Sequence, residues 1–403
     1  MADENRDRPE PIGFQDLARR AMLRDLDQMS RRMLLKHGGR FATAAALFAA
    51  GLPLSAAAQD ATPAAPAVAL PEITSIPDNL KGSGEVTVAS YGGTFQDAQR
   101  EAYFKPFEQL SGIKVNEAEG PDTAKVKAMV DTGNIEWDVA EFDRAGVINL
   151  EKKGDYWEEI DYSLFDTANI DQERMFKYSI DMLPYAQIIG YRTDVFAQGP
   201  QGWKDFWDTT NFPGPRTMIS GNGGLYPFLE AALIADGVSP QELYPLDIDR
   251  AFDSLSKIRD SVVKFWDAGA VPAQMLTDKE AVMAVIWNGR MKALMDQGVP
   301  VAIQWNEGAF LTDVWAIPKG APNKDNAQKF AAFITMAIPQ ARLSKLIPYG
   351  SVNNKSIDYM TPEEIKGLLT SPDIKSKLFT FNSQWWADNL DTVLDKWNEW
   401  ILG

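Results

Sequence analysis

Short apolar runs alternate with amphipathic stretches along most of this chain, and that alternation limits the folds open to it. Residues 86–90 have the pattern of a buried strand, and the Gly-rich turn 91–94 separates them from an amphipathic stretch at 95–109. The next predicted elements are a strand at 113–116, a helix at 123–132 and a strand at 137–141. Such alternation predicts an α/β fold with a parallel sheet and ligands at the carboxyl ends of the strands.

The later half repeats this organisation. Its predicted elements are strands at 187–191, 217–220 and 284–287 and helices at 226–236 and 249–268. With 403 residues in all, the chain is long enough for about two domains. We therefore expect two α/β lobes. Their sequences are not internal repeats of each other.

The first 58 residues have the organisation of a bacterial export signal. Arg31 and Arg32 precede an apolar stretch at 41–54, and small residues follow it up to Ala58. The apolar stretch is too short and too rich in alanine to span a bilayer stably. We predict a twin-arginine signal at 1–58 cleaved after Ala58, and a periplasmic product. The alternative, a cytosolic amphipathic helix, leaves the order of basic, apolar and small residues unexplained.

Cleavage would restrict the available chemistry. The chain has no cysteine, and its one histidine, His37, lies within the predicted signal. Histidine-based relays, thiolate nucleophiles, histidine-ligated zinc and disulfides are therefore excluded for the mature protein. The net charge changes from −16 to −18 when the signal is removed, which disfavours nucleic acid as a partner. We predict no cofactor and no metal.

The segment 59–83 has little to bury. Alanine and proline dominate residues 61–77, a composition typical of a linker. We expect it to join the signal to the folded part.

The order of landmarks from about Gly84 to the end resembles the periplasmic solute-binding proteins of ATP-driven importers, of the spermidine/putrescine-binding type. The stretches that carry this resemblance are Val88-Ala89-Ser90-Tyr91-Gly92-Gly93, Phe107-Glu108-Gln109-Leu110-Ser111-Gly112-Ile113-Lys114-Val115, Trp137-Asp138-Val139, Val285-Ile286-Trp287-Asn288-Gly289, Thr312-Asp313-Val314-Trp315-Ala316-Ile317-Pro318 and Ile347-Pro348-Tyr349-Gly350. The resemblance implies two lobes joined by hinge strands, a ligand in the cleft, and an ABC permease in the inner membrane as partner. We place lobe 1 at 84–187 and 309–346, place lobe 2 at 188–308 and 347–403, and expect a monomer.

Three site residues follow from the resemblance. It places Trp287 on the aromatic wall against the ligand, Asp313 as the partner of a ligand amine, and Tyr349 as a further aromatic contact. A cation–π contact at Trp287 would contribute on the order of 0.5 to 2 kcal/mol. The alternatives are a core role for Trp287 and turn or helix capping for Asp313.

Other positions depart from the polyamine pattern. The loop at 221–226 carries Asn222 where polyamine binders have acidic residues, so it has no charge. Arg290 follows the Trp287 motif and Arg144 follows Asp143, which could bring guanidinium groups to a carboxylate-bearing ligand. Solvated helix starts are the alternative for both arginines. At Tyr91, the Gly-rich turn and a helix start would offer peptide N–H groups to an anion, although such turns are also common without a ligand.

The sequence thus predicts a receptor for an amine-containing solute. Polyamine is the default that the resemblance gives, and a zwitterionic amino-acid-like or opine-like solute fits the residues at least as well. A periplasmic hydrolase or lyase with paired carboxylates is the alternative from another class; its candidates are Glu141 with Asp143, or Glu158 with Glu159. An iron-binding protein of the same fold is disfavoured because no Tyr-Tyr pair occurs.

Overall fold

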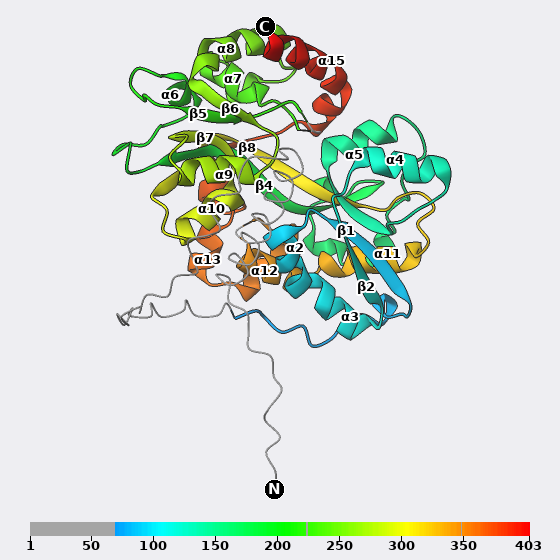
Figure 1. Cartoon of the computed structure of the whole chain (residues 1–403). Helices are drawn as coiled ribbons and strands as arrows, with labels where there is room; N and C mark the ends of the chain where they lie inside the picture. Colours follow the sequence, from blue (N-terminus) through cyan, green and yellow to red (C-terminus); the bar gives the residue numbers. More distant parts are fainter. Residues whose placement is uncertain (1–68, 223–224, 348) are drawn as a thin grey trace, which may run out of the picture.

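The computed structural model describes residues 69–222, 225–347 and 349–403 (Figure 1). The predicted export signal, with Arg31, Arg32 and Ala58, and residues 59–68 of the predicted linker therefore lie outside the described residues. No described helix has the length and the apolar character that crossing a membrane requires.

One mixed sheet runs through the described part of the chain. Its nine strands are ordered β2-β1-β3-β8-β4-β7-β5-β6, with β9 paired to β8. The strands are β1 (Glu85–Ser90), β2 (Lys114–Glu119), β3 (Val139–Asp143), β4 (Ser179–Arg192), β5 (Arg216–Ile219), β6 (Val262–Trp266), β7 (Met283–Trp287), β8 (Val301–Ala316) and β9 (Leu378–Thr380).

The predicted parallel sheet is correct within each half of the molecule but not at the centre. β1 pairs in parallel with β2 and β3, and β5 pairs in parallel with β6 and β7. Between these groups, the long strands β4 and β8 are antiparallel to each other and to their outer neighbours. Both long strands pass from one half to the other, as the hinge strands implied by the family resemblance would (Figure 1).

The first half has a continuous helical stretch directly after β1. It consists of α2 (Gly93–Gln99), a π-helical turn at Arg100–Phe104 and α3 (Lys105–Ser111), and Gly112 ends it in the left-handed conformation at φ 78°. The other helices of this half are α4 (Thr123–Thr132), α5 (Arg144–Glu151), α11 (Lys324–Ile334) and α12 (Ala337–Leu346). The sequence predicted α4 with the observed bounds.

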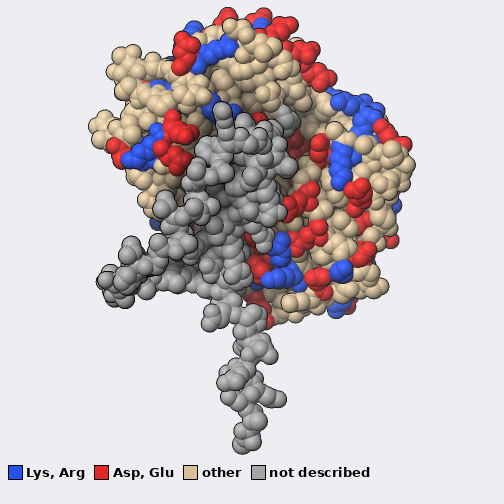
Figure 2. All heavy atoms as spheres, in the orientation of Figure 1, with Lys and Arg blue, Asp and Glu red and all other residues tan. Residues whose placement is uncertain are grey.

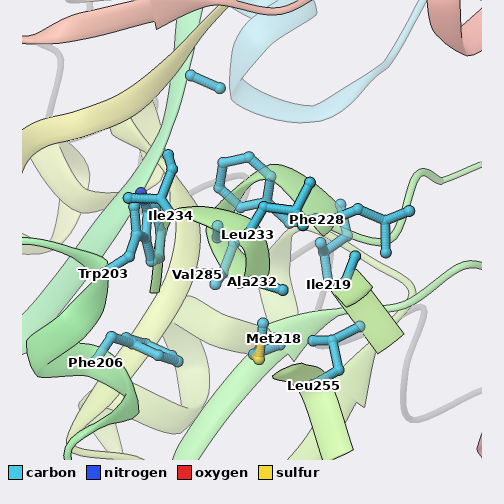
Figure 3. Close-up of a cluster of buried hydrophobic side chains, with 14 of the residues drawn as sticks. Trp203, Phe206, Met218, Ile219, Phe228, Ala232, Leu233, Ile234, Leu255 and Val285 are labelled. Atoms are coloured by element: carbon cyan, nitrogen blue, oxygen red, sulfur yellow. The ribbon is translucent and has the colours of Figure 1, made fainter. Parts of the chain in front are cut away.

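The second half encloses a large aromatic core. Trp203, Phe206 and Phe228 are buried there with aliphatic side chains from β5, β7 and α8 (Figure 3). Trp266 belongs to the same buried cluster. Its helices are α6 (Trp203–Trp207), α7 (Leu229–Ala235), α8 (Ile248–Ile258), α9 (Ala270–Thr277), α10 (Asn288–Asp296), α13 (Pro362–Gly367), α14 (Pro372–Lys375) and α15 (Ser383–Leu402).

The helix expected at 249–268 is wrong in its second part. α8 ends at Ile258, and residues 262–266 form β6 in parallel with β5. This segment contains adjacent valines and aromatic residues, which suit a pleated sheet, and the neighbouring strand satisfies its backbone groups.

The segment after α12 keeps its contacts with the first half. Asn353 forms a β-bridge with Ile170 and donates from Nδ2 to the Thr335 carbonyl at 2.9 Å. The chain therefore enters the second half later than the predicted change at residue 347. The reason is that these polar contacts anchor the turn on α11 and α12.

The visible surface is charged in a mixed way. Figure 2 shows Asp and Glu side chains interspersed with Lys and Arg over the visible described surface. The overall acidity of the chain is therefore distributed over this face, as in many soluble proteins.

Candidate functional site

A cavity of about 820 Å³ lies between the two halves. Four parallel strands end at it: Tyr91 follows β1, while Asp143, Ile219 and Trp287 are the last residues of β3, β5 and β7. The sequence predicted a ligand site at the carboxyl ends of strands, and the cavity has this position with respect to both halves.

The structure brings six of the eight candidate residues together. The cavity is lined by Tyr91, Asp143, Trp287, Arg290, Asp313 and Tyr349. Arg144 and Asn222 are not among its lining residues.

Arg144 is engaged elsewhere. Its guanidinium lies 3.2 Å from the ring centre of Phe176 and donates to Ser179 Oγ at 3.1 Å. Burial lowers the pKa of Arg144 to about 10. Its contacts connect α5 to the start of β4. Asn222 is exposed, and its backbone N–H donates to Ser220 Oγ at 3.1 Å.

The turn at Tyr91 requires glycine. Gly92 and Gly93 have φ angles of 72° and 61°, which side chains with a Cβ rarely adopt. The Gly92 N–H donates to Gln96 Oε1 at 3.1 Å. This N–H group, one of those expected to bind an anion, therefore already has a partner within the chain. The Tyr91 side chain is 47% exposed at the cavity.

Two carboxyl groups form an acidic wall on the first half. Asp143 on β3 is directly paired with Asp313 on β8. Asp143 caps α5 by accepting from the Gly146 N–H at 2.7 Å, and it also accepts from the Tyr226 hydroxyl. Burial raises the pKa of both aspartates, and for Asp313 the negative charges of Asp143 and Glu141 raise the pKa further.

The acidic wall has no cation. Neither Asp143 nor Asp313 forms an ion pair with a Lys or Arg among the described residues. Buried carboxylates without a cation are costly, so this wall would gain from a positively charged ligand.

Glu141 lies behind the wall, fully buried. It accepts from Ser90 Oγ at 2.8 Å and from Gln99 Nε2, and burial raises its pKa to about 8. Because it does not line the cavity, it cannot converge with Asp143 on a substrate there.

The other carboxylate pair is also remote from the cavity. Glu158 lies 3.7 Å from Lys324 Nζ, and Glu159 forms an ion pair with Lys177 at 3.0 Å. Neither glutamate lines the cavity, so the two lack the shared cleft that a catalytic pair needs.

Tyr185 on β4 links the two sides of the cavity. Its ring centre is 6.4 Å from Trp287 and 6.4 Å from Tyr349, both in edge-to-face geometry. The Tyr185 hydroxyl also interacts with Asp313 and opposes the rise in the pKa of that aspartate. The sequence-based prediction missed Tyr185 because it began this strand at residue 187; the alternation of Leu183, Tyr185 and Gln187 was the signal available.

The second half contributes an aromatic residue and a basic residue to the cavity. Trp287 is partly buried and packs edge-to-face on Trp266, at 5.3 Å between ring centres. Arg290 follows in the first turn of α10 and forms no ion pair with a described residue. Its charge opposes the rise in the pKa of Tyr349, which burial brings to about 12.

Contacts between the halves close one side of the cavity. On the rim, α5 meets α15, where Asn149 Nδ2 donates to the Ala387 carbonyl at 3.3 Å and Lys152 pairs with Asp388 (Figure 1). Inside, the Tyr226 hydroxyl donates to Asp143. These contacts join the two halves in the conformation described here.

No group of three or more Asp, Glu, His or Cys side chains in the described part of the chain is arranged to hold a metal ion. The cavity lining combines carboxyl groups, a guanidinium group and aromatic rings.

Comparison with known proteins identifies a matching family. The model of the bacterial extracellular solute-binding protein family matches residues 102–371. The gamma-aminobutyric acid-binding protein of Pseudomonas aeruginosa is 34% identical over 325 residues, which cover 79% of this chain and 91% of that protein. The spermidine/putrescine-binding periplasmic protein of Escherichia coli is 26% identical over 235 residues, which cover 56% and 65%.

Solved structures of substrate-binding proteins also resemble this chain. An ABC transporter substrate-binding protein from Bradyrhizobium japonicum superposes with a TM-score of 0.75 at 31% identity, covering 79% of this chain and all of that one. AgtB from Agrobacterium tumefaciens R10, solved in complex with agropinic acid, gives a TM-score of 0.71 at 34% identity, covering 79% of this chain and 99% of that one.

Proposed function

This chain belongs to the family of bacterial extracellular solute-binding proteins, and we propose that it captures a solute with one ammonium and one carboxylate group. The family consists of substrate-binding proteins of ABC transporters rather than enzymes, and they deliver small solutes to permeases. In this proposal the ammonium binds at Asp313 and the carboxylate binds at Arg290.

A single observation carries the proposal. Asp313 and Arg290 line the same cavity, yet they form no ion pair with each other or with any other described residue. Opposite charges held apart in one cavity suit a ligand that carries the complementary charge at each end. A bare diamine would satisfy Asp313 and would be repelled by Arg290.

The relatives support this choice over a polyamine. The Pseudomonas aeruginosa relative is named for gamma-aminobutyric acid, an ω-amino acid, and it matches a larger share of this chain than the spermidine/putrescine-binding protein does. AgtB was solved with agropinic acid. The polyamine default of the sequence analysis thus has weaker support than its zwitterionic alternative.

Binding would involve both halves. An ammonium held by the acidic wall would lie against Tyr185 and Trp287, whose rings offer cation–π contacts. In an open form without the contacts between the halves, the ligand would bind first at the acidic wall; rotation about β4 and β8 to the joined conformation would then bring Arg290 to the carboxylate, and the permease would recognise that closed form.

Isothermal titration of the wild type and of Arg290→Ala tests the proposal. We expect the wild type to bind γ-aminobutyrate and the variant to bind it roughly 10- to 150-fold more weakly, because a hydrogen-bonded charge pair contributes about 1.5 to 3 kcal/mol. Putrescine affinity should stay unchanged or increase when the positive charge is removed. Arg250→Ala, which removes an exposed arginine of the second half, is the matched control.

Two outcomes would contradict the proposal. Tight putrescine binding by the wild type, without γ-aminobutyrate binding, would return the protein to the polyamine group. Equal loss of both ligands in Arg290→Ala would show that the arginine supports the fold of the site rather than a carboxylate.

Export by the twin-arginine route completes the proposal and places the protein in the periplasm. Replacing Arg31 and Arg32 by lysine should leave unprocessed protein in the cytoplasm, because the export receptor reads the guanidinium pair. Normal periplasmic recovery of that variant would refute the twin-arginine interpretation.

A further inference from the structure

Gln187 presents an unusual side chain to the cavity. It lines the cavity on β4, is only 4% exposed, and its Nε2 atom has no hydrogen-bond partner among the described residues. Leaving a buried amide unpaired costs about 1 to 3 kcal/mol, so such a group is expected to find a partner in the working state of the protein.

The strand geometry directs this side chain to the cavity. Leu183, Tyr185 and Gln187 alternate along β4 and all line the cavity, whereas Ile188 points into a separate apolar cluster. The pairing of β4 with β8 shifts its register between Gln187 and Ile189. Such irregularities redirect side chains, and they are frequent beside binding sites.

Gln187 lies toward the basic end of the cavity. Its backbone is paired with that of Trp287, the residue directly before α10, and the first turn of α10 carries Arg290. Asp313 is paired instead with Leu183, four residues earlier on β4. At about 3.3 Å per residue, these two positions on β4 are about 13 Å apart.

We propose that the Gln187 amide donates to the carboxylate of the ligand beside Arg290, and thereby selects solutes whose two charged groups are far apart. The inference rests on the proposed function and adds a length requirement to it. An α-amino acid has both groups on one carbon, so it suits two partners this far apart less well. An ω-amino acid, or a longer solute with the same terminal groups, can span the two positions.

The test combines Gln187→Leu with a ligand series. Glycine, γ-aminobutyrate, 5-aminovalerate and 6-aminohexanoate are titrated against the wild type and the variant, with butylamine as a ligand that lacks the carboxylate. We expect the wild type to bind the ω-amino acids at least tenfold more tightly than glycine. The variant should bind the best of them roughly tenfold more weakly and bind butylamine as the wild type does.

Two controls exclude a merely structural role. Gln304→Met alters the other long strand at a glutamine whose Nε2 donates to the Pro200 carbonyl at 2.6 Å outside the cavity, and it should leave every affinity unchanged. Gln187→Leu should melt no lower than the wild type, because it removes an unpaired buried amide.

The possible results separate the two proposals. Suppose that the wild type binds ω-amino acids. If Gln187→Leu binds them with the same affinity, or if its affinity for butylamine falls as much as its affinity for ω-amino acids, the role of Gln187 is refuted. The proposed function would stand in either case. If glycine binds best, the length requirement is refuted. If none of these amines and amino acids binds, both proposals are refuted.

Discussion

The two walls of the cavity differ in charge, although each half builds its wall from the carboxyl ends of parallel strands. The first half supplies Asp143 and Asp313, adjacent acids that pair with no cation of the described residues. The second half supplies Trp287 and then Arg290, a base that pairs with no described acid. Each wall thus leaves a charge unbalanced within the described part of the chain, and a zwitterionic ligand between the walls would balance both.

The strand connections explain this difference. In the first half, β3 is antiparallel to β8, so two side chains from distant parts of the sequence meet directly as Asp143 and Asp313. In the second half, β7 leads straight into α10, and Arg290 lies one helical turn after Trp287. The acids therefore depend on a pairing between strands, whereas the base depends on a local turn.

Removing the acid at the centre of the first wall should have the largest effect. We expect Asp313→Asn to weaken binding of every ammonium ligand by about 1.5 to 3 kcal/mol, with or without a carboxylate on the ligand. The apo protein should melt no lower, because the variant relieves the repulsion with Asp143. Titration calorimetry and thermal melts measure both effects.

Asp253→Asn, on the exposed side of α8, is the matched control for the loss of one negative charge. It should change neither the ligand affinity nor the melting temperature. If Asp313→Asn kept full affinity for γ-aminobutyrate and butylamine, the ammonium would have to bind elsewhere.

Trp287 tests the second wall. Trp287→Ala should weaken ligand binding by at least tenfold, about 1.4 kcal/mol, because the ligand loses an aromatic face. Because the ring also packs on Trp266 and against Gly269, the variant should lose stability as well.

Trp287→Phe separates these roles, since it keeps an apolar ring in the same place. We expect it to regain most of the stability and part of the affinity. Unchanged affinity in a stable Trp287→Ala variant would remove this residue from the binding site.

The buried acids of the first half should give the apo protein a characteristic pH dependence. The pKa of Glu141 rises from 4.5 in the unfolded chain to about 8 in the fold, so the native state binds more protons in this window. Its contribution to stability is fully present below pH 4.5 and is lost as the pH rises through 8. Glu141→Gln should therefore reduce the fall of the melting temperature between pH 5 and pH 8.5.

Thermal melts of the wild type and of Glu141→Gln between pH 5 and pH 8.5 check the sign of this pH dependence. A variant whose melting temperature falls as steeply as that of the wild type would show that Glu141 is not the source of the dependence. Asp181 and Glu230, whose pKa values burial raises to about 7, supply part of the slope that should remain, and Asp143 and Asp313, whose pKa values are also raised, supply another part.

The smallest expected effect concerns the rim contact between the walls. Lys152→Met removes the exposed ion pair with Asp388, which joins α5 to α15. Surface pairs contribute about 0.2 to 1 kcal/mol, so affinity should fall by at most roughly fivefold at low salt and should not change at 1 M salt. A loss that persisted at high salt would point to a packing change instead. Asp388→Asn should reproduce the effect, and the double variant should add little to it.

Local pattern predicted much of the fold. Alternating apolar runs located β1, β5 and β7, and the helix at 123–132 has the observed bounds. The pattern failed at 262–266, where pairing with β5 decides between strand and helix. It also left β8 unassigned, because the mixed composition of this long strand reflects an element with many half-buried positions.

The candidate site, like the fold, was predicted only in part from the sequence. Six of eight predicted residues line the cavity: Tyr91, Asp143 and Arg290 were chosen from local strand ends and turns, and Trp287, Asp313 and Tyr349 from the family resemblance. Arg144 directly follows the end of β3, and Arg290 lies in the first turn of the helix after β7, yet Arg144 turns away from the cavity to stack on Phe176. Local sequence does not show this difference, because the ring that captures Arg144 comes from a segment 32 residues later.

What the sequence by itself determined was the class of the fold, the strand ends that border the cavity, and the types of charged residue available there, since all three depend on short-range pattern and composition. Tertiary structure alone decided which charges meet. The pairing of Asp143 with Asp313, the unpaired amide of Gln187 and the central place of Tyr185 arise where β3, β4, β7 and β8 lie side by side. The physical reason is that the burial of a residue, and whether its charge has a partner, depend on the residues next to it in space. In a sheet those neighbours come from distant parts of the chain.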